Sequence, residues 1–190
     1  MTPSKEELIA TVRQYYDSTN AFLFTTELSP EASRRADIWE QWTADMHPWY
    51  AFKGELRSSL PGYGLGETYC SADGGPRCIV YMPDDSGSSQ PNWDVVGCVS
   101  LLAPVYFVHG VEWELSGGRR RNTRVSFESP PPHMEWPARA VAQTIEKMLG
   151  LSAFPREWVE TPVPLYAGLL EPSRTNLFHT LFTNAPASIP

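Results

Sequence analysis

Basic residues are scarce in this sequence, and cysteines and long apolar runs are scarcer still. Asp and Glu together number 22 and Lys and Arg together 15, which leaves a net charge of −7. Nonspecific binding to nucleic acid depends on neutralising phosphates with basic side chains, so this balance argues against nucleic acid and against an anionic membrane surface. A basic protein is the complementary partner, although a modest negative charge also simply keeps a protein in solution.

No membrane span or secretory leader is visible. The longest apolar stretch, 95–111, is broken by glycine, serine, proline and histidine and is typical of strands. Residues 1–10 lack the apolar core of a signal peptide, so we expect a cytoplasmic location. Cysteines stay reduced there. Cys70 and Cys78 flank an expected hairpin loop and face each other across it, but we interpret them as buried or half-buried thiols rather than a disulfide.

Complete catalytic motifs are also absent. The four histidines show no metal-ligand spacing, and no serine lies in a Gly-x-Ser-x-Gly elbow. The glycine-rich run 62–66 lacks the Lys-Ser/Thr pair of a phosphate-binding loop and indicates a turn. Cys98 and His109 lie in apolar strand segments, where such side chains usually belong to the core. We therefore predict no catalytic residue, no cofactor and no metal.

The length of 190 residues and a hydrophobic content of 42% suit one globular domain, 1–190. Its parts follow in order: a helical N-terminal part (1–50), an antiparallel sheet (63–128), and a helix with a proline-rich tail (133–190). This order predicts the α+β class, with a mainly antiparallel β-sheet and about three helices packed on one face.

Start and stop signals define the three expected helices. Ser4 and Glu7 form a capping box at the first. The second begins at Ser29-Pro30 and stops at His47-Pro48, because the residue before a proline leaves the helical region. The third runs from about 136 to 149, with Gly150 as terminator.

The hairpin around Gly117-Gly118 poses a question of register. A two-residue turn would place Val125 and Phe127 on the face of Glu112 and Glu114, which conflicts with the apolar pattern. A three-residue turn, 116–118, removes the conflict and sets Glu114 opposite Arg120. We therefore predict the longer turn.

Two acidic surfaces are the candidate partner-binding sites. The first is the polar loop 83–94, in which the aspartates Asp84, Asp85 and Asp94 accompany an aromatic anchor, Trp93. The second is a pair of outward-facing glutamates in the next hairpin, Glu112 and Glu114. Charge steers a basic partner and the aromatic side chain buries against it. The alternative is an ordinary surface, with the glutamates balanced by the arginines 119–121 and 124.

The order of elements in the C-terminal half resembles bacterial immunity proteins of polymorphic-toxin systems. A strand (122–128), a triple proline, a helix (141–149) and the run Pro155-Arg156-Glu157-Trp158-Val159 carry this resemblance. It implies a non-catalytic inhibitor that binds one cognate toxin tightly and covers its active site. The resemblance assigns no functional residue.

Two other classes of function stay open. A hydrolase would use Glu112, Glu114 and a nearby histidine, and it requires these groups to meet in a cleft. A small-molecule or peptide-binding module would use the aromatic residues, which make up 12% of the chain. A deep apolar cavity lined by several Trp or Tyr side chains would favour that module.

Overall fold

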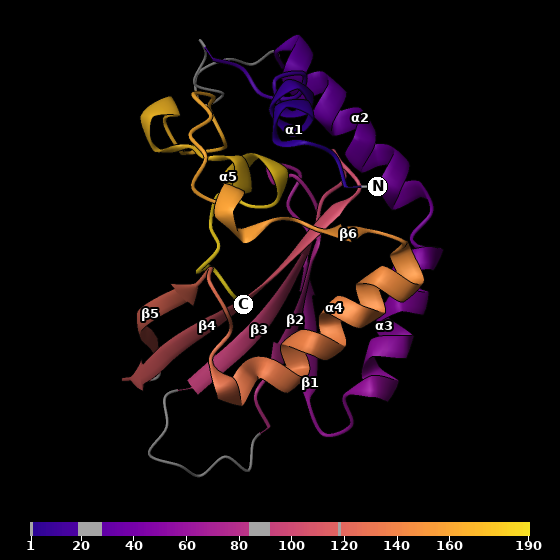
Figure 1. The fold of residues 1–190 in the computed structure, drawn as a ribbon, viewed down its shortest axis with the longest axis vertical. Coiled ribbons are helices and arrows are strands. Elements are labelled where there is room, and N and C mark those ends of the chain that lie inside the picture. The colour runs from indigo at the N-terminus through magenta and orange to yellow at the C-terminus, as the bar shows by residue number, and fades with distance from the viewer. Residues whose placement is uncertain (1, 19–27, 84–91, 118) are drawn as a thin grey trace.

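The computed structural model describes residues 2–18, 28–83, 92–117 and 119–190, and its centre is a six-stranded sheet (Figure 1). Five antiparallel strands neighbour one another in chain order: β1 (Gly64–Thr68), β2 (Arg77–Tyr81), β3 (Asn92–Val99), β4 (Val105–Ser116) and β5 (Arg119–Ser126). The short β6 (Ser152–Ala153) pairs with β4 in parallel. The predicted α+β class with a mainly antiparallel sheet is confirmed.

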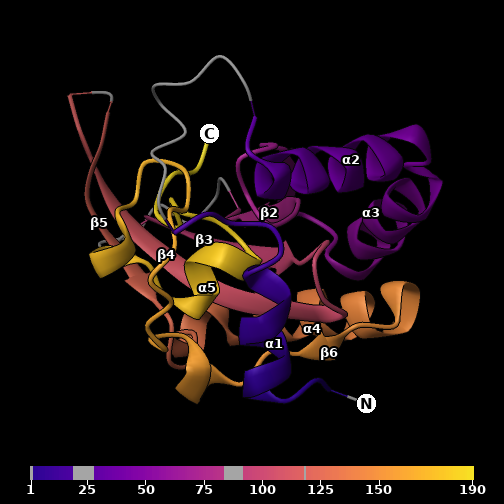
Figure 2. The ribbon, with the colours of Figure 1, turned by 90° about the horizontal axis from the view of Figure 1, so that it is seen from above.

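Helices cover both faces of this sheet. They are α1 (Lys5–Val12), α2 (Pro30–Ala44), α3 (His47–Ser59), α4 (Glu135–Leu149) and α5 (Leu177–Leu181). Figure 2 shows α4 on one side of the strands and the C-terminus on the other. The predicted packing of the helices on one face of the sheet holds for α3 and α4. α1, α5 and the C-terminal segment cover the opposite face instead. No described helix is long and apolar enough to cross a membrane.

Each face of the sheet has its own apolar core. On one face Phe52 and Leu56 of α3 and Val141 of α4 pack against strand residues such as Val95. On the other, α1 and α5 pack against a set that includes Val96, Phe107 and Val111. Successive strand residues point to opposite faces, so the apolar run 95–99 supplies both cores.

The segment that follows α5 runs along the second face and bonds to the sheet through its backbone. Arg77 on β2 donates to the carbonyls of Ala185 and Ser188 at 3.3 and 3.0 Å. Arg120 on β5 donates to the carbonyl of Ile189 at 3.3 Å. Two strands at a distance in the sequence are thus joined by one stretch of irregular chain.

The predicted stop at His47-Pro48 is also the start of an unpredicted helix. α2 ends at Ala44, and α3 begins at His47 with Pro48 in its first turn. A proline at this position costs no helical hydrogen bond, because the first N–H groups of a helix have no partner within the helix. The His47-Pro48 pattern predicts the end of one helix but not the start of another, so α3 was not predicted.

The hairpin register is corrected by a bulge rather than by a longer turn. Ser116 pairs with Arg119, so two residues connect β4 and β5, and residue 118 itself lies outside the described part of the chain. Between Glu112 and Glu114 the register shifts, because β5 carries one extra residue there, and Asn122 has φ +52°. Val125 and Val111 share a face of the hairpin, as predicted, but they are direct partners, and Glu114 faces Arg121 and not Arg120.

The cysteines are three free thiols. Cys78 lies in β2 opposite Glu67, so the expected meeting of Cys78 with Cys70 is wrong. Cys78 and Cys98 are buried core thiols, as predicted, and burial raises the pKa of both, to about 12 for Cys78. Cys70 is exposed, contrary to the prediction.

Candidate functional site

Trp93 and Asp94 lie in β3 and not in an exposed loop, so their predicted placement is wrong. Their exposed fractions are 7% and 1%. The Trp93 ring packs between Tyr63 and His133, on the opposite face of β3 from Asp94. In this conformation neither side chain is accessible to a partner. Asp84 and Asp85, the other half of the predicted acidic surface, lie outside the described residues.

Asp94 holds the β4–β5 hairpin to the rest of the sheet. Its Oδ2 accepts a hydrogen bond from Trp113 Nε1 at 2.8 Å and lies 3.2 Å from Arg120 Nη1. The Arg120 guanidinium also stacks over the Trp113 ring, 4.4 Å from its centroid. Burial raises the pKa of Asp94 in spite of the opposing Arg120 charge and the Trp113 bond. The carboxylate therefore has a structural task that the sequence pattern did not reveal.

Replacing Asp94 with asparagine is expected to lower the free energy of unfolding by about 1–2 kcal/mol. Removing one partner of a fully buried ion pair costs about 3–5 kcal/mol, but burial already penalises the Asp94 charge and Arg120 stays partly in water. Urea unfolding measures the change. Glu114→Gln, on an exposed hairpin residue, serves as the control, and an equal loss in the two variants would contradict the assignment.

Glu112 and Glu114 engage different partners. Glu112 Oε1 lies 3.5 Å from His133 Nε2, and the Glu112 side chain is 19% exposed. The exposed Glu114 accepts a hydrogen bond from Asn122 at 2.6 Å. Neither lines either of the two hollows described below, so the geometry brings one glutamate and one histidine together without assembling the expected pair of carboxylates. Binding of a partner by these residues stays a prediction.

One surface hollow lies where three connections meet, and we call it the Trp42 groove. Its volume is about 450 Å³. All of its lining residues except Asp45 and Ser100 are apolar: Trp42, Pro48, Trp49, Val99, Leu101, Leu102, Ala103, Pro104, Leu149 and Leu151. A second hollow, of about 240 Å³, lies between α4 and β4.

Local sequence explains how the three connections reach the Trp42 groove. The short link from α2 to α3 places Trp42 in the last turn of one helix and Trp49 in the first turn of the next. The β3–β4 connection contributes residues 99–104. Gly150, with φ +67°, ends α4 in the left-handed region and turns the chain toward β6.

A network of aromatic rings fixes Trp42. Its ring centroid lies 5.4 Å from Trp39, 5.9 Å from Trp49 and 5.4 Å from Tyr69. Trp49 Nε1 in turn donates to Glu67 Oε2 at 2.8 Å. Burial opposes ionisation of Glu67, but hydrogen bonds from Lys53, Tyr69 and Trp49 lower its pKa. The wall of the groove is therefore ordered before any ligand arrives, which reduces the entropic cost of binding.

Sequence reasoning identified an aromatic-rich chain but not the Trp42 groove. The signal was present in the spacing of Trp39, Trp42 and Trp49, which places three indoles near a proline. The spacing alone does not predict the groove. The three rings come together only when two consecutive helices, α2 and α3, carry them, and α3 was not predicted.

Comparison with known proteins adds no relative. The sequence matches no protein family, no curated protein and no solved structure. Within the described residues, no group of three or more His, Cys, Asp or Glu side chains is placed to hold a metal ion.

Proposed function

We propose that this chain is a non-catalytic binding protein that holds an apolar and basic segment of a partner protein in the Trp42 groove. The observation that carries the proposal is an apolar groove with a fixed indole on its wall and one carboxylate, Asp45, in its lining. Its volume falls within the roughly 300–1,000 Å³ typical of ligand clefts.

Anchoring by apolar side chains accounts for most of the expected affinity. Fully burying one Leu, Ile or Phe side chain contributes about 1.5–3 kcal/mol. Trp and Tyr are enriched among the residues that dominate interface energies, and Trp42 is half-buried, so part of its ring area is left for a partner. The buried Trp49 supports it from behind.

Charge decides the kind of segment that fits. Asp45 favours a lysine or arginine next to the apolar anchor, and the net charge of −7 attracts a basic protein over a longer range. Both effects are screened by salt, so association is expected to slow as the ionic strength rises.

The partner class follows from the resemblance to immunity proteins, which stays a prediction. On that interpretation the segment belongs to a toxin, and the complex covers the active site of the toxin. The hydrolase alternative has less support, because neither Glu112 nor Glu114 lines the Trp42 groove or the hollow between α4 and β4.

Selection from a display library of random short peptides tests the proposal. Enriched peptides are expected to carry an aromatic or branched aliphatic anchor beside Lys or Arg. Trp42→Ala, Asp45→Lys and the groove-filling Ala103→Phe should each weaken binding at least about tenfold, which corresponds to about 1.4 kcal/mol. Fluorescence polarisation with a selected peptide measures the change.

Matched controls separate the groove from general surface effects. Trp136→Ala removes an exposed indole of α4, and Asp37→Lys reverses a charge on α2; neither residue lines the groove, so both variants should bind normally. The proposal fails if no peptides are enriched, or if the selected peptides bind Ala103→Phe as tightly as they bind the unchanged protein.

A further inference from the structure

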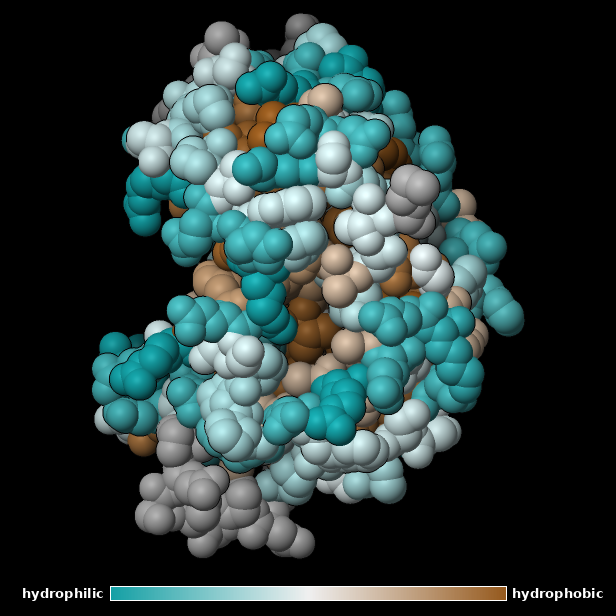
Figure 3. Space-filling model, in the orientation of Figure 1, coloured by the Kyte–Doolittle hydropathy of each residue, from teal (hydrophilic) through white to brown (hydrophobic). Residues whose placement is uncertain are grey.

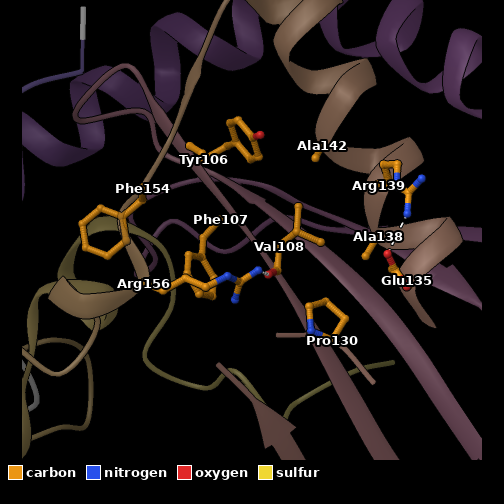
Figure 4. A pocket seen from close by; sticks show the side chains of 11 residues that line it. Tyr106, Phe107, Val108, Pro130, Glu135, Ala138, Arg139, Ala142, Phe154 and Arg156 are labelled. Carbon is orange, nitrogen blue, oxygen red and sulfur yellow. Dashed lines mark hydrogen bonds and ion pairs between the residues drawn. The ribbon is translucent and has the colours of Figure 1, made fainter. Parts of the chain in front are cut away.

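A second hollow, which we call the Arg156 pocket, opens between α4 and β4. Figure 3 shows an apolar floor near the middle of this face with hydrophilic residues around it, and Figure 4 shows the lining side chains. The floor and walls combine aromatic and small residues with three charged ones: Tyr106, Phe107, Val108, Pro130, Glu135, Ala138, Arg139, Ala142, Ala153, Phe154 and Arg156. The lining shares no residue with the Trp42 groove.

The pocket exists because one edge of β4 changes partner. β6 pairs with Val105 and Tyr106, and β5 pairs from Gly110 onward. In the gap between them, Arg156 Nη2 donates to the carbonyl of Val108 at 3.0 Å. Its Nη1 donates to the carbonyl of Phe127 at 2.6 Å. The arginine thus occupies the place of a missing strand and satisfies backbone oxygens there.

The Arg156 guanidinium carries a charge that no carboxylate balances. No acidic side chain of the described residues lies within salt-bridge distance of it. It stacks over Phe107, 4.8 Å from the ring centroid. Although the residue as a whole is exposed, desolvation of the guanidinium lowers its pKa. A partly desolvated cation without a counter-charge attracts an anion.

The other walls offer apolar contact and a second cation. The hydroxyl of Tyr106 donates to Glu146 at 2.6 Å, which leaves the ring to line the pocket. Opposite Arg156, as Figure 4 shows, Arg139 pairs with Glu135 one helical turn away. Both of these side chains are more than half exposed. Such surface pairs are weak, so an incoming anion competes readily for Arg139.

We propose that the Arg156 pocket binds a small aromatic carboxylate, with the carboxylate on the Arg156 guanidinium and the ring against Phe107, Phe154 and Val108. A planar, bidentate anion matches the fork of a guanidinium. The volume of about 240 Å³ suits one ring with a short acidic side chain rather than a drug-sized ligand.

Calorimetric titration with phenylacetate tests this site. We expect a dissociation constant on the order of 100 µM, since a ligand with so few atoms gains limited binding energy. Phenylacetamide, which has the same shape without the charge, should bind at least about tenfold more weakly, and acetate, which lacks the ring, should not bind measurably. Equal affinity for phenylacetate and phenylacetamide would overturn the proposal.

Three variants locate the binding. Arg156→Gln removes the cation, Ala142→Leu fills the pocket while Arg156 stays in place, and Arg57→Gln removes an exposed arginine of α3 as a control. The first two should abolish binding and the third should not change it. If Arg156→Gln fails to fold, Ala142→Leu still decides, because phenylacetate binding that survives the filled pocket overturns the assignment. Peptide binding in the Trp42 groove should be unaffected by Ala142→Leu, so the two proposals fail separately.

Discussion

Replacing His109 with leucine is expected to remove a large part of the loss of stability that acid causes between about pH 6.5 and pH 3. His109 is fully buried, its Nδ1 has no hydrogen-bond partner within the described structure, and its Nε2 lies 3.5 Å from the carbonyl of Pro186. Burial lowers its pKa to about 3, and the charges of Arg77 and Arg156 act in the same direction.

The direction of the pH effect follows from which state binds the proton. An unfolded histidine takes up a proton near pH 6.5, whereas the folded His109 does so near pH 3. Acidification between these values therefore stabilises the unfolded state, by about 1.4 kcal/mol per pH unit and roughly 3–5 kcal/mol in total. The leucine variant has no proton to take up at this position, so its free energy of unfolding lacks this dependence on pH. The substitution also removes a buried nitrogen that has no hydrogen-bond partner.

Urea unfolding of the unchanged protein and His109→Leu at several pH values measures the difference. Burial raises the pKa of Asp73 and Asp94, so these carboxyls favour the folded state as the pH falls, but both proteins share them and they cancel. His47→Gln, on the exposed first residue of α3, is the control and should keep the original pH slope. Parallel slopes for the unchanged protein and His109→Leu would refute the role of His109.

The second large effect is expected from Gly75→Ala. A Cβ at Gly75 would overlap the carbonyl oxygen of Val99 and crowd the backbone nitrogen of Leu101. Neither atom is the end of a flexible side chain, so the end of β3 must shift. We expect a loss of at least about 3 kcal/mol, or no folded protein.

Gly54→Ala is the matched control for Gly75→Ala. Gly54 lies in the middle of α3, is exposed, and has nothing within 4 Å of its missing Cβ. Alanine there should raise the free energy of unfolding by about 0.5–1 kcal/mol, because glycine is the poorer helix former. Thermal unfolding distinguishes the two results, and a comparable stability of the two variants would mean that the backbone at Gly75 has room to move.

Local features of the fold were predictable, and features made by distant segments were not. The capping box of Ser4 and Glu7, the terminator Gly150 and the antiparallel strands depend on neighbours in the sequence, and the structure confirms them. The loop placement of Trp93 failed because the burial of β3 depends on helices more than thirty residues away on either side. Likewise the sequence predicts only a hairpin loop between Cys70 and Cys78, yet within it the N–H of Gly74 donates to the carbonyl of the distant Phe182.

The candidate sites were less predictable than the fold. Trp42 and Asp45 lie near a helix end, but the groove also needs the β3–β4 connection and Leu151, which no periodicity brings together. Arg156 lies in the run Pro155-Arg156-Glu157-Trp158-Val159, and none of its neighbours along the chain distinguishes it as a binding residue. Its position in the gap between β5 and β6 follows from strand pairing, which is visible in three dimensions alone.

The backbone contacts between the C-terminal segment and the sheet also set an order in time. During synthesis β2 and β5 leave the ribosome well before residues 182–190. Until those residues arrive, Arg77 and Arg120 lack the carbonyls that hold them in the finished molecule, and one face of the sheet is open. The nascent protein therefore passes through a stage in which apolar strand residues are exposed. At this stage it is most prone to aggregation and gains most from binding to chaperones.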